Sequence, residues 1–262
     1  MMHMRRGTFL AISATAALVA ALTATTTVAA ADGASTLRQV GTFEALVQPN
    51  FSGLAPLNAA TQGATLGLGT FANLDGEYVL IAGQGYRVPT SGVPVRVSGQ
   101  EMTPFVQAVR FMPTHSAPVP PGTQCSQLTP IIDALAKSSD GIVSVRLRGT
   151  FTALTMRSVP AQQEPWPSLA TVIANQSQFI LDGKRAVLVG FRQGPDFLGV
   201  GQPGLHLHGL TADRTAGGHV LSCTAGADAQ LSIQRVASVS VQGVVAPERR
   251  TEVLASPGPA RD

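Results

Sequence analysis

The segment Gly204-Leu205-His206-Leu207-His208, followed by Gly217-Gly218-His219, holds three of the five histidines in a chain of 262 residues. Side chains two residues apart on a β-strand point to the same side, so His206 and His208 share a face. The turn-forming residues between the two blocks predict a hairpin, whose returning strand at 219–223 places His219 beside them. Three imidazoles on one face are typical of a catalytic zinc site, which keeps a fourth position for water or substrate. The alternative is that the His-x-His pair is an accident of the surface.

The first 31 residues have the three parts of a secretory signal peptide. Arg5 and Arg6 give a basic start, residues 9–22 are mostly apolar, and Ala29-Ala30-Ala31 offers a cleavage site. We therefore expect residues 1–31 to be removed and the mature protein to be exported, either to a periplasm or as a secreted protein. The alternative is an uncleaved anchor, although the segment is short for a membrane span.

The mature chain is close to electrically neutral. Removing Arg5 and Arg6 from the 18 basic residues leaves 16, against 15 acidic residues. The sequence has no basic patch of the kind that binds nucleic acid, and no later segment is long and apolar enough to span a membrane. We expect neither nucleic acid nor, after leader cleavage, a membrane as a partner.

The two cysteines, Cys125 and Cys223, are expected to form a disulfide. An exported chain meets an oxidising environment, and an even number of cysteines can pair completely. Two free buried thiols are the alternative. Zinc ligation by Cys223 is a weaker one, because three imidazoles already provide a catalytic site.

Composition and residue patterns favour a strand-rich α/β protein of the α+β type. Charged and aromatic residues are sparse, whereas Ala, Val, Leu, Gly and Thr are plentiful, which suits a globular enzyme rather than a disordered chain. Residues 142–154 alternate between apolar and polar side chains as a strand does, and residues 126–136 have the apolar spacing of a helix. Residues 50–63 and the Pro-rich residues 114–123 are expected to be loops.

The segment 159–167 contains three prolines and has the composition of a linker, so it is the expected boundary between two domains. We expect an N-terminal domain with a mixed β-sheet at residues 32–160 and a C-terminal antiparallel β domain at residues 161–262. The second domain would carry the zinc site on its hairpin, and its tail would be loose from about residue 256.

Five blocks follow one another along the chain. They are Gly67-Leu68-Gly69-Thr70-Phe71-Ala72-Asn73-Leu74-Asp75-Gly76-Glu77, Thr103-Pro104-Phe105, Gly149-Thr150-Phe151 with Arg157-Ser158-Val159-Pro160, Gly190-Phe191-Arg192, and the histidine segment through to Leu221. Their sequences and their order resemble the bacterial α-acetolactate decarboxylase family. The resemblance runs from about residue 43 to residue 221.

The resemblance implies which residues form the site. The zinc ligands would be His206, His208 and His219. The catalytic residues would be Glu77, Arg157 and a glutamate of the C-terminal tail, for which Glu252 is the first candidate and Glu248 the second. Thr70 matches a threonine that lines the family's site, so Thr70 and Arg157 would bind the substrate.

The resemblance also implies the reaction. The family converts 2-acetolactate, a branched 2-hydroxy-3-keto acid, to acetoin and carbon dioxide through a metal-stabilised enediolate. The resemblance also implies that the protein is a homodimer. Zn²⁺ would polarise the C3 ketone, which takes up the electrons that carbon dioxide leaves behind. Arg157 would orient the carboxylate, and Glu77 would protonate the enediolate carbon.

The chain departs from the family's pattern at Gly209, where a bulky residue is usual, and at Thr65-Leu66, where an acidic and an aromatic residue are common. We expect these changes to affect pocket shape more than metal binding. Two other functions remain: a cupin-like exported metalloprotein, and a non-catalytic metal- or ligand-binding protein. Cupins follow His-x-His closely with a Glu ligand, whereas Asp213 is the nearest carboxylate here, and a zinc binder needs neither Glu77 nor Arg157.

Overall fold

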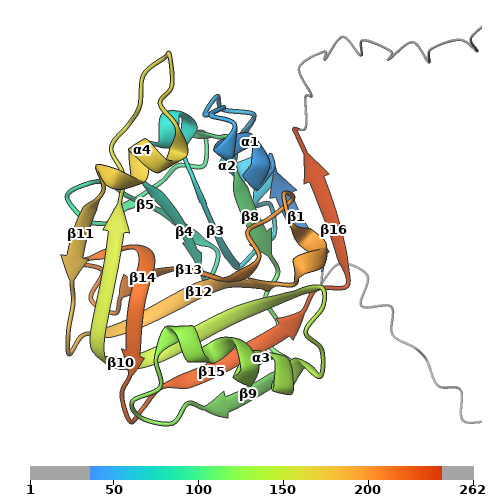
Figure 1. Cartoon of the computed structure of the whole chain (residues 1–262), viewed down its shortest axis with the longest axis vertical. Helices are drawn as coiled ribbons and strands as arrows, with labels where there is room; N and C mark the ends of the chain where they lie inside the picture. Colours follow the sequence, from blue (N-terminus) through green and yellow to red (C-terminus); the bar gives the residue numbers. More distant parts are fainter. Residues whose placement is uncertain (1–35, 244–262) are drawn as a thin grey trace, which may run out of the picture. The chain divides into compact units, whose positions relative to one another are not determined.

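Two seven-stranded β-sheets form the framework of the described chain, which is residues 36–243 of this computed structural model (Figure 1). The protein is a mixed α+β chain rich in strands, as its composition and alternation predict. The expected signal peptide at residues 1–31, the tail from residue 256, and both Glu248 and Glu252 lie outside the described residues.

The first sheet has the strand order β16-β1-β8-β3-β4-β5-β6. Its strands are β1 (Thr36–Val40), β3 (Leu66–Thr70), β4 (Glu77–Ile81), β5 (Gln84–Val88), β6 (Val95–Arg96), β8 (Val106–Val109) and β16 (Ser238–Gln242). The sheet is mixed, because β16 runs parallel to β1 while its other neighbouring pairs are antiparallel. The short strands β2 (Ala55–Pro56) and β7 (Met102–Thr103) form a separate antiparallel pair.

The second sheet is antiparallel and is organised around one long strand. Its strands are β9 (His115–Pro118), β10 (Ile142–Ser158), β11 (Ser177–Ile180), β12 (Arg185–Gln193), β13 (Gly204–Thr211), β14 (Gly217–Ala225) and β15 (Gln230–Arg235). The first half of β10 pairs with β12 and β15, and its second half with β14 and β11. Since β12, β13, β14 and β10 are each paired with the next and β10 also with β12, these four strands form a closed circuit.

Alternate residues of the first sheet belong to two different cores. Leu68 of β3 and Val79 of β4 pack in a cluster that includes Phe191 of β12 and Leu210 of β13, so this cluster joins the two sheets. The next residue along β4, Leu80, packs in a separate cluster on the other face. Burial on both faces explains why all five residues of β3 are buried, whereas a half-exposed strand would alternate.

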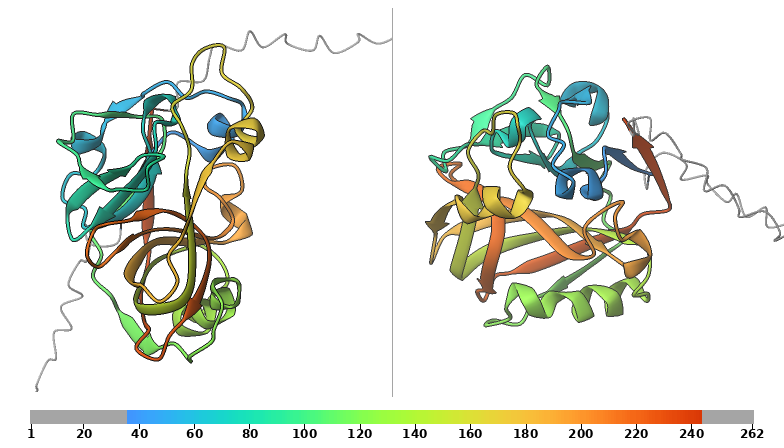
Figure 2. Two further views of the ribbon diagram at one scale, coloured as in Figure 1. Left: turned by 90° about the vertical axis from the view of Figure 1, so that its left-hand side faces the viewer. Right: turned by 45° about the horizontal axis from the view of Figure 1, so that its top comes forward.

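Short helices cover the remaining faces. The helix α2 (Leu57–Ala60) buries Leu57 and Ala60 in the cluster on the far face of the first sheet. The helix α3 (Leu128–Ala136) lies along the second sheet and packs Leu128 and Ile132 against it (Figure 2). The two other helices, α1 (Phe43–Val47) and α4 (Leu169–Ala174), contribute residues to the site described below.

The expectation of loops at residues 50–63 and 114–123 is wrong in part. Residues 57–60 form α2, because Leu57 and Ala60 are three apart and both reach the core. Residues 115–118 form β9, which pairs with β15 at the edge of the second sheet. An edge strand tolerates Pro118 since one side of it needs no ladder hydrogen bond, and for this reason its proline content hides it from sequence reasoning.

The two sheets do not divide the chain at residue 160. The strand β16 follows the hairpin in sequence but belongs to the first sheet, while β9, α3 and β10 precede residue 160 and belong to the second sheet or its cover. The division into domains at residues 32–160 and 161–262 therefore does not coincide with the division into sheets, and it stays a prediction.

The predicted disulfide between Cys125 and Cys223 is present. The two Cα atoms are 5.1 Å apart, and the cysteines are separated by 98 residues in sequence. Cys125 begins the short 3₁₀ turn Cys125–Gln127 that leads into α3, and Cys223 lies on β14. The bond therefore joins the covering helix to the strand that carries His219.

Replacing both cysteines, as Cys125→Ser with Cys223→Ser, is expected to lower the free energy of unfolding by about 4 kcal/mol, because a disulfide that closes so long a loop restricts the unfolded chain. Denaturant unfolding followed by circular dichroism measures this change. Ser126→Ala, at an exposed neighbour in the same turn, is the control and should leave stability unchanged. A loss below about 1 kcal/mol in the double variant would contradict the expectation.

Candidate metal centre

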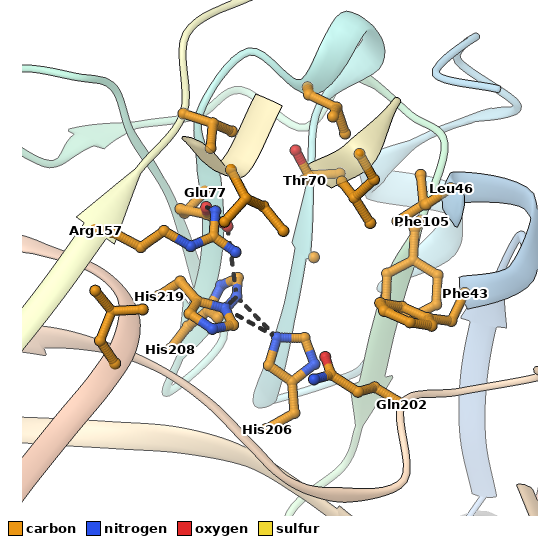
Figure 3. A pocket seen from close by; sticks show the side chains of 16 residues that line it. Phe43, Leu46, Thr70, Glu77, Phe105, Arg157, Gln202, His206, His208 and His219 are labelled. Carbon is orange, nitrogen blue, oxygen red and sulfur yellow. Dashed lines mark hydrogen bonds and ion pairs between the residues drawn. The ribbon is translucent and has the colours of Figure 1, made fainter. Parts of the chain in front are cut away.

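Three imidazole nitrogens meet at one point between the two sheets (Figure 3). His206 Nε2 lies 3.2 Å from His208 Nε2 and 3.2 Å from His219 Nδ1, and the third separation, between His208 and His219, is also 3.2 Å. Two nitrogens bound to one tetrahedral metal ion at about 2.0–2.1 Å, the usual zinc–imidazole distance, lie roughly 3.3 Å apart. The spacing of the three nitrogens therefore fits a single metal ion.

Strand pairing creates this arrangement. His206 and His208 lie two residues apart on β13, and β14 pairs antiparallel with β13 so that His208 lies opposite His219. Next to His219, Gly218 has a φ of +140°, and a Cβ at this position would lie 2.3 Å from the carbonyl oxygen of Arg157. Only glycine fits there, so Gly218 allows β14 to approach β10 beside the site.

The first sheet fixes the orientation of His208. Its Nδ1 lies 2.8 Å from the backbone carbonyl oxygen of Tyr78 on β4. A carbonyl can only accept a hydrogen bond, so Nδ1 carries the proton and Nε2 keeps its lone pair for a metal ion. This contact is the kind of outer-shell bond that holds a metal-binding imidazole in one tautomer.

Burial keeps the three imidazoles neutral. It is the main reason that the pKa of His206 falls to about 3, with the charge of Arg157 as a second cause. Burial likewise holds the pKa of His208 and of His219 well below the usual value, with neighbouring imidazoles and Arg157 adding to the effect. Neutral imidazole is the form that binds a metal ion, so the donor set is ready without the loss of a proton.

A buried ion pair lies directly beside the imidazoles. Arg157 Nη1 donates to Glu77 Oε1 at 2.6 Å, and Glu77 Oε2 lies 3.5 Å from His208 Nε2. The two side chains come from different sheets, Glu77 from β4 and Arg157 from β10, where Arg157 lies opposite His219. Burial raises the pKa of Glu77, and the opposing effect of Arg157 is smaller.

A tight turn of unusual backbone conformation leads into Glu77. Asn73 and Leu74 both have positive φ angles, 62° and 56°, and Gly76 follows with +87°. Leucine rarely adopts this conformation, and such strain gathers at functional sites. The Thr70 hydroxyl donates to the Gly76 carbonyl at 2.8 Å and ties the turn to β3. The Asn-Leu-Asp-Gly turn thus sets the position of Glu77.

These groups line a cavity of about 220 Å³. Its polar end is formed by the three histidines, Glu77, Arg157 and Thr70, and its opposite side is apolar, with Phe43, Leu46 and Phe105 (Figure 3). Leu169 and Ile173 of α4 also line it. A small polar molecule with aliphatic groups suits such a cavity.

Sequence reasoning missed several residues that line this cavity. Gln202 lies beside His206 (Figure 3), and Phe43 and Leu46 come from the short helix α1. None of the three is part of a motif with chemical meaning, so no signal in one sequence identifies them. Gln202 lies two residues before the hairpin strand β13, and only this closeness in sequence suggests that its loop reaches the site.

The expectation that Gly209 and Thr65-Leu66 alter the shape of this cavity is wrong. Gly209 faces away from it, because a Cβ there would lie 2.4 Å from Leu188 and 2.9 Å from Met156 in the core of the second sheet. Thr65 and Leu66 line a different cavity. None of these three positions therefore lines the metal cavity.

The fold and the site define a strand-rich α+β protein with a three-histidine group beside a buried arginine–glutamate pair. Residues 37–249 match the sequence model of the α-acetolactate decarboxylase family. The chain belongs to this family.

Two curated relatives, both named α-acetolactate decarboxylase, give the level of similarity. The one from Methanosarcina mazei is 35% identical over 185 residues, which are 71% of this chain and 64% of that protein. The one from Brevibacillus brevis is 31% identical over 186 residues, which are 71% of this chain and 65% of that protein. The match thus spans slightly less than two thirds of the length of these relatives.

Solved structures show the same fold. The α-acetolactate decarboxylase from Bacillus subtilis strain 168 superposes with a TM-score of 0.76 at 25% identity, covering 79% of this chain and 88% of the other. A Staphylococcus aureus protein, described as of unknown function and similar to α-acetolactate decarboxylase, gives 0.75 at 27% identity, with the same coverage.

Proposed function

We propose that this protein is a zinc-dependent decarboxylase that converts 2-acetolactate to acetoin and carbon dioxide. The observation that carries the proposal is that three imidazoles, Glu77 and Arg157 line one small cavity. Family membership supports the reaction, and the relatives' names supply the substrate. The cavity's apolar side suits the methyl groups of a branched keto acid.

The imidazoles of His206, His208 and His219 would hold the metal ion, and their spacing supports zinc. A bound Zn²⁺ would supply Lewis-acid polarisation of the substrate ketone, the group that must take up the electron pair left by carbon dioxide. Three protein ligands leave a coordination position open, which is the pattern of catalytic rather than structural zinc sites.

Arg157 and Glu77 have separate tasks in the proposed reaction. The guanidinium of Arg157 orients the substrate carboxylate, and it contributes positioning more than ground-state binding, because a tight grip would oppose the departure of carbon dioxide. Loss of carbon dioxide breaks the bond from C2 to the carboxyl carbon and leaves an enediolate. Glu77 delivers a proton to C2 of the enediolate, which restores the ketone and gives acetoin.

Thr70 and the C-terminal tail complete the proposed site. The Thr70 hydroxyl donates to Gly76, so its oxygen has acceptor capacity for a substrate hydroxyl. Glu252, or in second place Glu248, is proposed as the tail glutamate near the metal.

The proposal extends to the protein's surroundings. We propose export to a periplasm or secretion, which the disulfide and the sequence of residues 1–31 support. Among the described residues, no helix has the length and apolar character needed to cross a membrane. The two-domain layout and the homodimer are part of the same proposal.

Assay of the purified, zinc-loaded protein with racemic 2-acetolactate tests the function. We expect acetoin, and because Glu77 approaches from one side we expect a single enantiomer. Chiral gas chromatography separates the outcomes. If the zinc-loaded protein forms no acetoin, the proposed function is wrong and a non-catalytic binding protein is the remaining alternative.

Arg157→Lys is expected to raise KM and lower kcat together. Lysine keeps the charge but loses the planar fork, so the carboxylate is held in a less defined orientation. Misplacement of this kind costs up to about 10²-fold in rate. Steady-state kinetics with 2-acetolactate measure both constants. Arg185→Lys, at an exposed arginine that pairs with Asp228 and does not line the metal cavity, is the control and should retain wild-type kinetics. Wild-type kinetics in Arg157→Lys would remove Arg157 from the site.

A further inference from the structure

A second cavity, of about 450 Å³, is lined by residues of both sheets. Leu66 and Ile81, which line it, pair at one end of the ladder between β3 and β4, whereas Thr70 and Glu77 pair at the other end. The two cavities therefore lie at opposite ends of the same two strands. The opposite wall comes from β10 and β12 of the second sheet.

Two arginines on one strand line this second cavity. Arg146 and Arg148 are two residues apart on β10, so their side chains leave the same face of the sheet. Within residues 36–243, no Asp or Glu lines the cavity, and neither arginine takes part in an ion pair. The Nε atom of Arg146 is buried and has no hydrogen-bond partner among these residues. Burying a hydrogen-bond donor without a partner costs free energy, so a ligand that supplies an acceptor to this atom would be favoured.

The guanidinium of Arg146 is also held in place. It lies over the ring of Phe111, with 5.3 Å from Cζ to the ring centre. The backbone N–H of Phe111 donates to the Thr65 hydroxyl at 2.9 Å, which fixes that segment to the start of β3. Burial lowers the pKa of Arg146, and the neighbouring charge of Arg148 lowers it further. Two like charges, one on the half-buried Arg146 and one on the exposed Arg148, thus lie side by side, and neither forms an ion pair within the described part of the chain.

We propose that this second cavity binds a small carboxylate with an aliphatic body, held by Arg146 and Arg148. A planar guanidinium matches the two oxygens of a carboxylate. The remaining walls, formed by Leu66, Ile81, Ala82, Val187 and Val189, offer the apolar surface that an aliphatic group needs. The site contains no metal ligand and does not depend on the proposed decarboxylase function.

Calorimetric titration of the full, metal-free protein with 2-methylpropanoate tests the proposal. Removing the metal ion excludes carboxylate coordination at the three histidines, and the arginine variants separate binding in the second cavity from binding at Arg157. Arg146→Gln with Arg148→Gln should weaken binding about 10- to 100-fold, the worth of one charge-assisted hydrogen bond or more. Arg185→Gln on β12 is the matched control, because Arg185 is exposed, pairs with Asp228 and does not line the cavity. It should bind as the wild type does.

A second variant keeps the test decisive if the double replacement fails to fold. Val187 lies opposite Arg148 in the pairing of β10 with β12, so Val187→Glu supplies a tethered carboxylate and should abolish binding. The neutral 2-methylpropanamide should bind at least about tenfold more weakly than the acid. Absence of 2-methylpropanoate binding to the wild type, unchanged binding in the variants, or equal affinity for inorganic phosphate would overturn the proposal.

Discussion

Glu77→Gln is expected to lower turnover of 2-acetolactate by about 10²–10⁴-fold, the usual contribution of a positioned general acid. The amide keeps the size and shape of the carboxyl group but carries no transferable proton. Zinc content is expected to stay near that of the wild type, because the three imidazoles would hold the ion without Glu77. Steady-state acetoin assays and metal analysis of the same sample give both numbers.

Glu44→Gln is the matched control for this variant. Glu44 lies on α1 and accepts a hydrogen bond from Gln48, so the same chemical change there should leave turnover intact. If Glu77→Gln loses zinc, Glu77 is a metal ligand and the proton comes from elsewhere, with Glu252 or a metal-bound water next in line. If the variant keeps both zinc and full turnover, the proposed proton transfer is wrong.

His208→Ala is expected to abolish both metal binding and turnover. His208 is fully enclosed, and its Nδ1 contact with Tyr78 gives the cluster its link to the first sheet. Changes to groups that merely orient a ligand weaken metal affinity about 10- to 100-fold, so removal of the ligand itself should cost more. Inductively coupled plasma mass spectrometry of the purified variant measures the zinc that remains.

His115→Ala provides the comparison, because His115 is exposed on the edge strand β9 and is no part of the cluster. It should retain wild-type zinc and turnover. Full zinc occupancy in His208→Ala, or in His206→Ala with His208→Ala, would overturn the assignment of the ligands. Loss of zinc in the His115 variant would show that metal content reports folding rather than ligation.

The sequence predicts the local parts of the site well. Two short-range features suffice for the histidine group: the spacing of His206 and His208, and the turn formers before His219. On a strand, the spacing places the first two side chains on one face, and a hairpin brings the third beside them. The disulfide is also predictable, from an even cysteine count and an apparent export signal. Each of these depends on residues close in sequence or on a simple rule of pairing.

The remaining parts depend on long-range contacts. The contact between Glu77 and Arg157 joins residues 80 apart in sequence, on strands of different sheets, and only the resemblance to a known family places them together beforehand. The parallel pairing of β16 with β1 joins residues still further apart, such as Thr36 and Ser238, which are 202 residues apart, and no local pattern encodes it. Strand β9 is not evident from the sequence because it ends in a proline within a proline-rich segment, and α2 is not evident because it is short.

Arg192 shows a further limit of motif reading. It belongs to the Gly-Phe-Arg block of the resemblance, yet it lies away from the metal cavity and is almost completely buried. Its guanidinium pairs with Asp133 and donates to the carbonyl oxygens of Ser138 and Ser139, which follow the end of α3. This arginine therefore stabilises the fold, and a shared motif alone does not separate such a residue from one that acts in the site.

The two alternative functions differ from the proposal in what surrounds the metal. A cupin-like site would place a glutamate close after the histidine pair, whereas Glu77 comes from another sheet and pairs with Arg157. A simple metal binder has no use for a buried ion pair beside its ligands, since burying two charges carries a cost. The arrangement therefore favours catalysis.

Titration of the metal-free protein with zinc, followed by the rate of acetoin formation from 2-acetolactate, tests the central claim most directly. The account predicts no acetoin above the spontaneous rate before zinc is added. It predicts a linear rise in rate that ends at about one zinc ion per chain, since residues 36–243 contain one group of three histidines that could hold a metal ion. Full activity of the metal-free protein, or no activity once one zinc ion per chain is bound, would contradict it.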